Sequence, residues 1–114
     1  IAMPHVTPLA YKVTESCLCD GWAWHHELLQ ALRTNRQTVF DWAAKHPEFE
    51  VTTGHATFLA WIESRKRTDL SEHFAKRGVR LSSGKPFGSE TAVRLNFGCS
   101  PATLSEALRR MDVR

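Results

Sequence analysis

Two cysteines and two histidines near the start of the chain carry the side chains that bind zinc. Cys17 and Cys19 are followed by the adjacent pair His25 and His26. Structural zinc sites need a particular spacing of thiolate and imidazole ligands, and a Cys-x-Cys pair followed by adjacent histidines lacks it. With Cys99 the cysteines number three, an odd count with no disulfide framework. We therefore expect no metal site and interpret the cysteines as small residues in or near the core.

Arg94 is the second candidate for chemistry. Apolar residues occupy every second position from Val93 to Phe97, the pattern of a strand with one face on a core. Arg94 and Asn96 therefore belong to the opposite face. A guanidinium offers a planar fork of donors to a carboxylate. A surface ion pair is the alternative role for an arginine on a strand.

Helices are predicted at both ends of the chain. The segment from Pro8 to about Cys19 is a candidate short helix, ended by the break at Asp20-Gly21. From Trp24 to His46-Pro47, apolar residues recur at helical spacing and predict the longest helix. Ser100-Pro101 supplies an N-cap and a first-turn proline for a last helix. That helix would bury Leu104, Leu108 and Met111.

Strands are predicted between these helices. The segments 49–53 and 57–62, separated by Gly54, favour a β-hairpin. A helix capped by Thr68 or Asp69 then ends at Gly78. A short strand at 79–81, a glycine- and serine-rich loop at 82–89 and a strand at 92–97 follow. The predicted fold is α+β, with helices covering one side of a small, mostly antiparallel sheet.

The composition is that of a folded protein. The chain has 114 residues, 42% hydrophobic and 24% charged, so we expect a single domain over residues 1–114 and exclude disordered and collagen-like classes. No apolar run reaches the roughly 18 to 20 residues that cross a bilayer. Residues 1–5 have no basic stretch leading into an apolar segment, so we expect no signal peptide. We expect a soluble, cytoplasmic protein with no membrane partner.

A nucleic-acid surface is the weakest functional hypothesis. The net charge is +3, and Arg109, Arg110 and Arg114 concentrate positive charge near the C-terminus. Together with the segment 34–46 they could contact phosphates. Basic residues in the last turn of a helix also complement its dipole, and no recognition motif is present. We therefore expect no nucleic-acid partner.

Several short motifs, in their order, resemble those of a known enzyme family. They are Asn35-Arg36, the stretch from Ala56 to Trp61, Gly78-Val79, the loop from Gly84 to Gly88, the segment from Val93 to Cys99, and the Leu104-x-x-Ala107-Leu108 helix. They are similar to the C-terminal small domain of fold type I pyridoxal phosphate (PLP) enzymes of the aminotransferase superfamily, in particular cystathionine β-lyases of the MalY and PatB type. The resemblance covers residues 10–111.

This resemblance implies roles for four side chains. In the family, the arginine of the Arg-Leu-Asn segment binds the α-carboxylate of an amino-acid substrate, and Arg94 stands at that position. Asn96 would hold the arginine in place, or face solvent. Phe87 and Phe58 would line the site, or belong to the core.

The resemblance also implies that the catalytic part is absent from this sequence. The Schiff-base lysine, the partner of the pyridine nitrogen and the phosphate-binding loop belong to the large domain of such enzymes. None of the five lysines matches the family's lysine motif; they are Lys12, Lys45, Lys66, Lys76 and Lys85. We therefore expect no catalytic residue here and no PLP bound to this chain alone, since PLP chemistry requires that lysine.

Two functions remain open at this point. The chain is either the substrate-carboxylate-binding domain of a PLP-dependent C–S lyase or aminotransferase, or a stand-alone interaction module that keeps the fold without the chemistry. Without a large domain, apolar surface near Arg94 and the first segment would be uncovered, which favours association. The expected partner is accordingly the large PLP-binding domain or another copy of the chain. The sequence does not distinguish a lyase from a transaminase.

Overall fold

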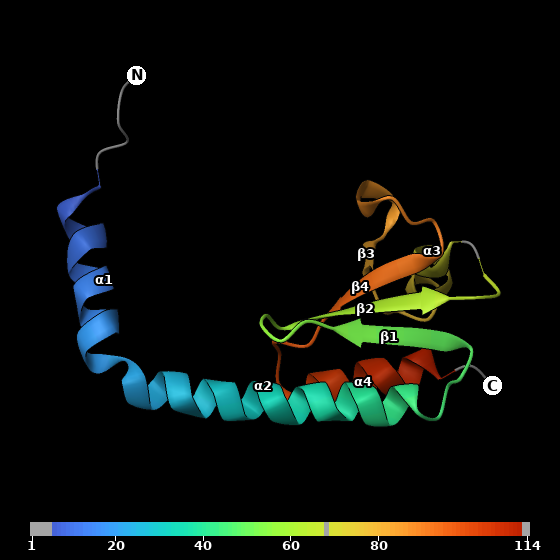
Figure 1. Cartoon of the computed structure of the whole chain (residues 1–114), viewed down its shortest axis with the longest axis horizontal. Helices are drawn as coiled ribbons and strands as arrows, with labels where there is room; N and C mark the ends of the chain where they lie inside the picture. Colours follow the sequence, from blue (N-terminus) through green and yellow to red (C-terminus); the bar gives the residue numbers. More distant parts are fainter. Residues whose placement is uncertain (1–5, 68, 113–114) are drawn as a thin grey trace, which may run out of the picture. The chain divides into compact units, whose positions relative to one another are not determined.

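A computed structural model of the chain describes residues 6–67 and 69–112 (Figure 1). Its elements, in chain order, are α1 (Pro8–Asp20), α2 (Trp22–Ala43), β1 (Phe49–Thr53), β2 (Leu59–Ser64), α3 (Leu70–Ala75), β3 (Ser82–Ser83), the 3₁₀ helix η1 (Lys85–Phe87), β4 (Ala92–Asn96) and α4 (Pro101–Met111). These elements confirm the predicted α+β class.

The four strands form one antiparallel sheet in the order β1-β2-β4-β3. The predicted hairpin is present, with Phe49 opposite Ser64 and Thr53 opposite Ala60. β4 then pairs with the other edge of β2 and places Arg94 directly opposite Trp61. The central pair β2–β4 thus fixes the position of Arg94 within the sheet.

One face of the sheet and the helices share a hydrophobic core. Along β4 the inward side chains Val93 and Leu95 are buried, whereas Asn96 is exposed and Arg94 half-buried, as the alternation predicts. α2 and α4 lie side by side along this face (Figure 1). The helical members of the core are Val39, Trp42, Leu70, Phe74, Leu104, Leu108 and Met111. The helices therefore leave the face that carries Arg94 uncovered.

Two helix starts follow the capping rules, and the cap at Ser100 is the predicted one. The Thr7 hydroxyl accepts from the Ala10 N–H at 3.2 Å, and the Ser100 hydroxyl accepts from the Thr103 N–H at 3.2 Å. A proline follows each cap in the first turn. Gly21 separates α1 from α2, and a Cβ there would lie 2.4 Å from the Cys17 carbonyl oxygen.

The predicted strand at residues 79–81 is wrong. The Val79 N–H donates to the Phe74 carbonyl at 3.0 Å, and the Gly78 N–H to the Ala75 carbonyl at 2.9 Å. With Gly78 at φ +77°, this is the Schellman arrangement that ends a helix. Because the chain is occupied in closing α3, pairing with β4 begins only at Ser82.

Two further predictions are wrong: that the Asp69 side chain caps α3, and that the cysteines lie in or near the core. Asp69 adopts φ +62°, ψ +42° and makes no side-chain cap; its carboxylate lies 3.3 Å from Lys85 Nζ instead. The alternative cap, Thr68, lies outside the described residues. Cys17, Cys19 and Cys99 are free thiols at exposed positions rather than core residues.

The chain groups into two compact units, residues 1–31 and 32–114. The hydrophobic core belongs to the second unit, since its buried members run from Val39 to Met111. In the first unit, α1 buries no residue. A single domain over residues 1–114 therefore stays a prediction.

Candidate functional site

Arg94 stands in the middle of a row of side chains on the uncovered face of the sheet. Trp61 lies opposite it on β2 and Ser82 opposite it on β3, while Thr52 on β1 continues the row beyond Trp61. Cross-strand neighbours on one face sit close enough for their side chains to pack. The base of Arg94 is thus enclosed on both sides.

Phe87 lies against the Arg94 guanidinium. The guanidinium carbon Cζ is 4.9 Å from the centroid of the Phe87 ring, which is a cation–π distance. The Phe87 ring also contacts Trp61 edge-on, with 6.0 Å between ring centroids and 87° between planes. The structure therefore brings together two of the predicted site residues, Arg94 and Phe87, and adds Trp61, which the sequence analysis did not select for the site.

A tight loop places Phe87 there. The 3₁₀ helix η1 lies between Gly84 and Gly88, and Gly88 has φ +85°. A Cβ on Gly84 would lie 2.7 Å from the Ala92 carbonyl oxygen and 2.8 Å from that of Ser89. Glycine at this position lets the loop fold back closely over β4, which brings the Phe87 ring to Arg94.

The Arg94 guanidinium has no carboxylate partner among residues 6–67 and 69–112. Glu63 belongs to the same face, two residues beyond Trp61 on β2. Its Oε1 accepts from the Thr91 hydroxyl at 2.9 Å and the Ser89 hydroxyl at 3.4 Å. Arg94 therefore keeps its hydrogen-bond donors available for an anion.

The other two predicted site residues lie together at the far end of β4. The Asn96 carbonyl oxygen Oδ1 accepts from the Gly98 N–H at 2.8 Å. A Cβ on Gly98 would lie 3.1 Å from Cγ of Phe58, so the Phe58 ring packs over that glycine. Asn96 thus shapes the turn after β4, and no contact joins it to Arg94 among the described residues. Its role as a support for Arg94 stays a prediction.

Asn35 holds the end of β4 to α2. Its amide nitrogen Nδ2 donates to the Phe97 carbonyl at 2.9 Å and to the Cys99 carbonyl at 2.8 Å, and the side chain is buried. Next to it, Arg36 Nε donates to the Thr53 hydroxyl at 2.8 Å, which ties α2 to β1. The sequence motif Asn35-Arg36 contributed to the family resemblance, but only the structure shows that it positions the strand carrying Arg94.

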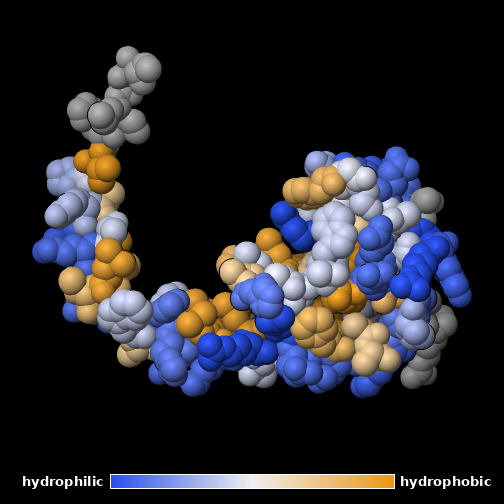
Figure 2. All heavy atoms as spheres, viewed as in Figure 1, coloured by the Kyte–Doolittle hydropathy of each residue, from blue (hydrophilic) through white to orange (hydrophobic). Residues whose placement is uncertain are grey.

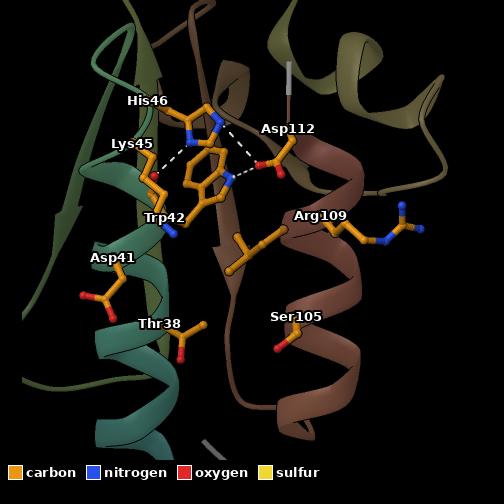
Figure 3. A pocket seen from close by; sticks show the side chains of 9 residues that line it. Thr38, Asp41, Trp42, Lys45, His46, Ser105, Arg109 and Asp112 are labelled. Atoms are coloured by element: carbon orange, nitrogen blue, oxygen red, sulfur yellow. Dashed lines mark hydrogen bonds and ion pairs between the residues drawn. The ribbon is translucent and has the colours of Figure 1, made fainter. Parts of the chain in front are cut away.

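A cavity of about 530 Å³ lies between α2 and α4 (Figure 3). Asp112 Oδ1 accepts from Trp42 Nε1 at 2.9 Å and lies 3.3 Å from His46 Nε2, while His46 Nδ1 is 2.8 Å from the Trp42 carbonyl oxygen. A carbonyl and a carboxylate both accept hydrogen bonds, and the His46 ring lies between the two. These groups join the ends of the two helices.

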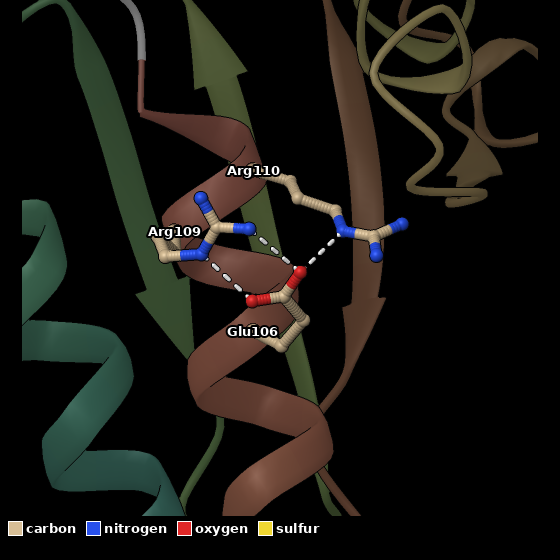
Figure 4. Close-up of polar contacts among 3 residues, drawn as sticks. All are labelled: Glu106, Arg109 and Arg110. Atoms are coloured by element: carbon tan, nitrogen blue, oxygen red, sulfur yellow. Dashed lines mark hydrogen bonds and ion pairs between the residues drawn. The ribbon is translucent and has the colours of Figure 1, made fainter.

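A surface carboxylate on α4 is held by two arginines (Figure 4). Arg109 donates to Glu106 from Nε at 2.7 Å and from Nη2 at 2.8 Å, and Arg110 donates from Nε at 2.7 Å. The pKa of Glu106 is lowered to about 2 by its hydrogen bonds, with that from Arg109 having the larger effect and that from Arg110 the next. Much of the basic charge near the C-terminus is therefore engaged within the helix, which weakens its use for binding phosphates.

His73 lies between two guanidinium groups. Arg77 Nη1 is 2.6 Å from its Nε2 and Arg67 Nη1 is 3.2 Å from its Nδ1. Partial burial, followed by the charges of Arg77, Arg67 and Lys76, lowers the pKa of His73 below the ordinary 6.5. A neutral imidazole has a single acceptor nitrogen, so at most one of these two contacts is a hydrogen bond.

The first unit carries exposed apolar side chains, visible along α1 in Figure 2. A cavity of about 450 Å³ in this unit is lined by Cys17, Leu18, Gly21, Trp22, Trp24 and His25. Trp22 and Trp24 are each about two-thirds exposed, at 67% and 68%. No group of three or more metal-binding side chains occurs in the part of the chain that the structure describes. Within the same residues, no helix is long and apolar enough to cross a membrane.

The comparisons with known proteins agree with this architecture. No model of a protein family matches the chain. Cystathionine beta-lyase PatB of Bacillus subtilis (strain 168) is 30% identical over 112 residues, which cover 90% of this chain and 29% of that protein. Cystathionine beta-lyase of Corynebacterium glutamicum is 32% identical over 114 residues, which cover 93% of this chain and 30% of that protein. The chain thus spans less than a third of the length of these relatives.

Solved structures match over nearly the whole chain. The crystal structure of OvoB has a TM-score of 0.88 and 36% identity, covering 96% of this chain and 29% of that one. The crystal structure of cystalysin from Treponema denticola contains a pyridoxal 5'-phosphate cofactor. It has a TM-score of 0.84 and 27% identity, covering 96% of this chain and 30% of that one. The fold is that of a segment of PLP-dependent enzymes. More narrowly, the matches confirm the resemblance to the C-terminal small domain of cystathionine β-lyases of the PatB type.

Proposed function

We propose that this chain is the substrate-carboxylate-binding domain of a PLP-dependent C–S lyase or aminotransferase, with Arg94 as the residue that binds the α-carboxylate of an amino acid. The observation that carries the proposal is the burial of the Arg94 side chain and its contacts. It is half-buried, supported by Phe87 and free of any carboxylate among the described residues. An immobilised guanidinium with free donors binds a carboxylate through two parallel hydrogen bonds.

The residues of this chain do not fit as holders of the cofactor. A lysine that forms an imine with PLP needs an environment that lowers its ammonium pKa, usually burial. All five lysines are exposed. Lys12, Lys76 and Lys85 lie within 3.3 Å of the carboxylates of Glu15, Glu72 and Asp69. We therefore assign to this chain the binding and orientation of the substrate, and no covalent step.

The cofactor would accordingly be held by the rest of an enzyme of the kind that the relatives represent. The exposed apolar side chains of residues 6–31 support this part of the proposal. α1 alone has 13 residues and buries none of them, and a helix of that length is marginal in water without tertiary contacts. We propose that Leu9, Leu18, Trp22 and Trp24 pack against a large PLP-binding domain.

Selective protection of Arg94 from chemical modification tests the carboxylate site. Phenylglyoxal reacts with accessible guanidinium groups, and mass spectrometry reports the modification of each arginine. An excess of an amino acid should slow the reaction at Arg94 and leave Arg80 unaffected, since Arg80 is exposed and belongs to no carboxylate site proposed here. Sodium chloride at the same ionic strength is the control. Equal protection of both arginines would reject the site.

Incubation with PLP tests the second half of the proposal. We expect no specific imine absorbance and, after borohydride reduction, no stoichiometric adduct at a single lysine. Scattered labelling at the level of free lysine agrees with an exposed set of side chains. A stoichiometric adduct at one of the five lysines would contradict the proposal and make the chain a PLP enzyme in its own right.

The alternative function is a stand-alone interaction module, and the same exposed apolar surface favours it. Sedimentation equilibrium of the purified chain separates the two. A concentration-dependent dimer that Trp22→Glu abolishes would support the module. A monomer that binds no second copy would leave the large PLP-binding domain as the partner of residues 6–31.

A further inference from the structure

The acidic side chains on the sheet face of Arg94 are each engaged elsewhere. Glu50 on β1 lies 3.2 Å from Arg65 Nη2, and Glu63 on β2 accepts from the hydroxyls of Ser89 and Thr91. Glu63 is the diagonal neighbour of Arg94 across the β2–β4 pair. Diagonal neighbours in an antiparallel pair are about 7 to 8 Å apart, a span that arginine and glutamate side chains can bridge. An Arg94–Glu63 ion pair is therefore within reach and is not formed.

One loop both supports the Arg94 guanidinium and holds the Glu63 carboxylate. The segment from Gly84 to Thr91 supplies Phe87, whose ring supports the guanidinium at 4.9 Å, and also Ser89 and Thr91, whose hydroxyls hold Glu63. The loop is anchored at its ends, since the Gly84 N–H donates to the Ala92 carbonyl at 2.9 Å and the Ser64 N–H to the Thr91 carbonyl at 3.0 Å. The anchored loop thus contacts Arg94 with one residue and holds the diagonal carboxylate of Glu63 with two others.

We propose that the loop from Gly84 to Thr91 keeps Arg94 free for a carboxylate ligand, with Phe87, Ser89 and Thr91 as positioning residues. Phe87 fixes the guanidinium, and Trp61 fixes the Phe87 ring from the side. Ser89 and Thr91 hold Glu63 away from Arg94. The inference rests on the proposed function, because it explains how the proposed carboxylate site is protected from an internal ion pair.

The test compares the mobility and the ligand affinity of Arg94 in variants of the full chain. The Nε–Hε group of each arginine gives a resolvable NMR signal in ¹⁵N-labelled protein, and acetate serves as the carboxylate probe. Phe87→Leu should increase the mobility of the Arg94 signal and weaken acetate binding about two- to five-fold, the size of an exposed cation–π contact. Phe87→Tyr, which keeps a ring, should restore both.

A second set of variants tests the hold on Glu63. The pair Ser89→Ala and Thr91→Val removes both hydroxyls while keeping the loop backbone. This variant should bring Glu63 to Arg94, seen as a changed Arg94 Nε–Hε shift and weaker acetate binding. Adding Glu63→Gln to it should return the acetate affinity to the wild-type value. No merely structural role of the hydroxyls explains such a rescue.

A matched control is available within the chain. Arg36 Cζ lies 5.5 Å from the ring centroid of Phe40, a second cation–π pair. Phe40→Leu should change the Arg36 signal and leave that of Arg94 unaltered. The proposal is overturned if Phe87→Leu and the double variant leave both the mobility and the acetate affinity of Arg94 as in the wild type. Absence of acetate binding to wild-type Arg94 would instead reject the proposed function, and the mobility comparison would still decide the positioning roles.

Discussion

The amide nitrogen of Asn35 on α2 donates to the Phe97 carbonyl, 62 residues further along the chain, at 2.9 Å. This contact, with the second bond to Cys99, fixes the end of the strand that carries Arg94. The orientation of Arg94 therefore depends on a buried polar contact on the opposite side of the sheet from its own guanidinium.

Asn35→Ala should destabilise the second unit. The variant leaves the buried Phe97 carbonyl and the partly buried Cys99 carbonyl without their donor. Leaving a buried acceptor unpaired costs on the order of 1 to 3 kcal/mol. We expect the free energy of unfolding, measured by urea denaturation, to fall by about 2 kcal/mol. Gln37→Ala on the same helix is the control, since Gln37 is exposed and its side-chain amide donates to Asp41 on the same helix. Equal stability of the two variants would show that Asn35 does not anchor β4.

Gly84→Ala should damage the loop that carries Phe87. The added methyl group would meet two backbone carbonyl oxygens, those of Ala92 and Ser89, below 3 Å, and backbone cannot move aside as a flexible side chain does. We expect a loss of about 1 to 3 kcal/mol in unfolding free energy, the usual cost of overpacking. Gly88→Ala is the comparison: its methyl group meets open space, so only the strain of φ +85° remains. A Gly88→Ala cost exceeding that of Gly84→Ala would contradict the geometry.

The stability of the second unit should rise with pH across the titration of His73. Its pKa is lowered in the folded chain, so the unfolded chain binds the proton more readily. The contribution of neutral His73 is complete above the ordinary pKa of 6.5 and decreases as the pH falls below that value. His73→Gln should flatten this part of the curve of urea midpoint against pH. An unchanged slope in that variant would assign the pH dependence to other groups.

Glu106 should also contribute stability that is lost as the pH falls, in a more acidic range than His73. Because Arg109 and Arg110 lower its pKa to about 2, ionised Glu106 stabilises α4 above the ordinary carboxylate pKa of 4.5, and this contribution is lost as the pH falls toward 2. The difference in thermal midpoint between wild type and Glu106→Gln should therefore shrink between pH 5 and pH 2. Glu90→Gln, which changes an exposed glutamate outside this cluster, is the control substitution.

Features that follow from local sequence patterns, such as the alternation of apolar residues along a strand, were predicted correctly. The alternation from Val93 to Phe97 assigned Arg94 to the uncovered face, and Ser100-Pro101 marked the start of α4, both confirmed by the structure. The predicted strand at 79–81 failed, because the pattern does not show that the Val79 N–H is used to end α3. The residue type of Asp69 likewise did not predict that its backbone adopts the left-handed conformation.

The candidate site was only partly predictable for a similar reason. The resemblance pointed to Arg94 and Phe87, which are in contact, and also to Phe58 and Asn96, which lie around Gly98 at the end of β4. The roles of all four in a site stay predictions. Trp61 was assigned only to the second strand of the predicted hairpin. Its contact with Phe87 depends on how the loop after β3 folds back over the sheet. Contacts made by loops across a sheet follow from tertiary packing and are absent from local patterns.

The central claim is that Arg94 recognises a carboxylate, and an NMR titration that compares acetate with acetamide tests it most directly. The two probes have nearly the same shape, but only acetate carries the charge that a guanidinium fork binds. We predict a saturable shift of the Arg94 Nε–Hε signal with acetate, no shift with acetamide, and no saturable shift of Arg80 with either. If Arg94 responds to acetate no more than Arg80 does, it is an ordinary surface arginine and the proposed function is wrong.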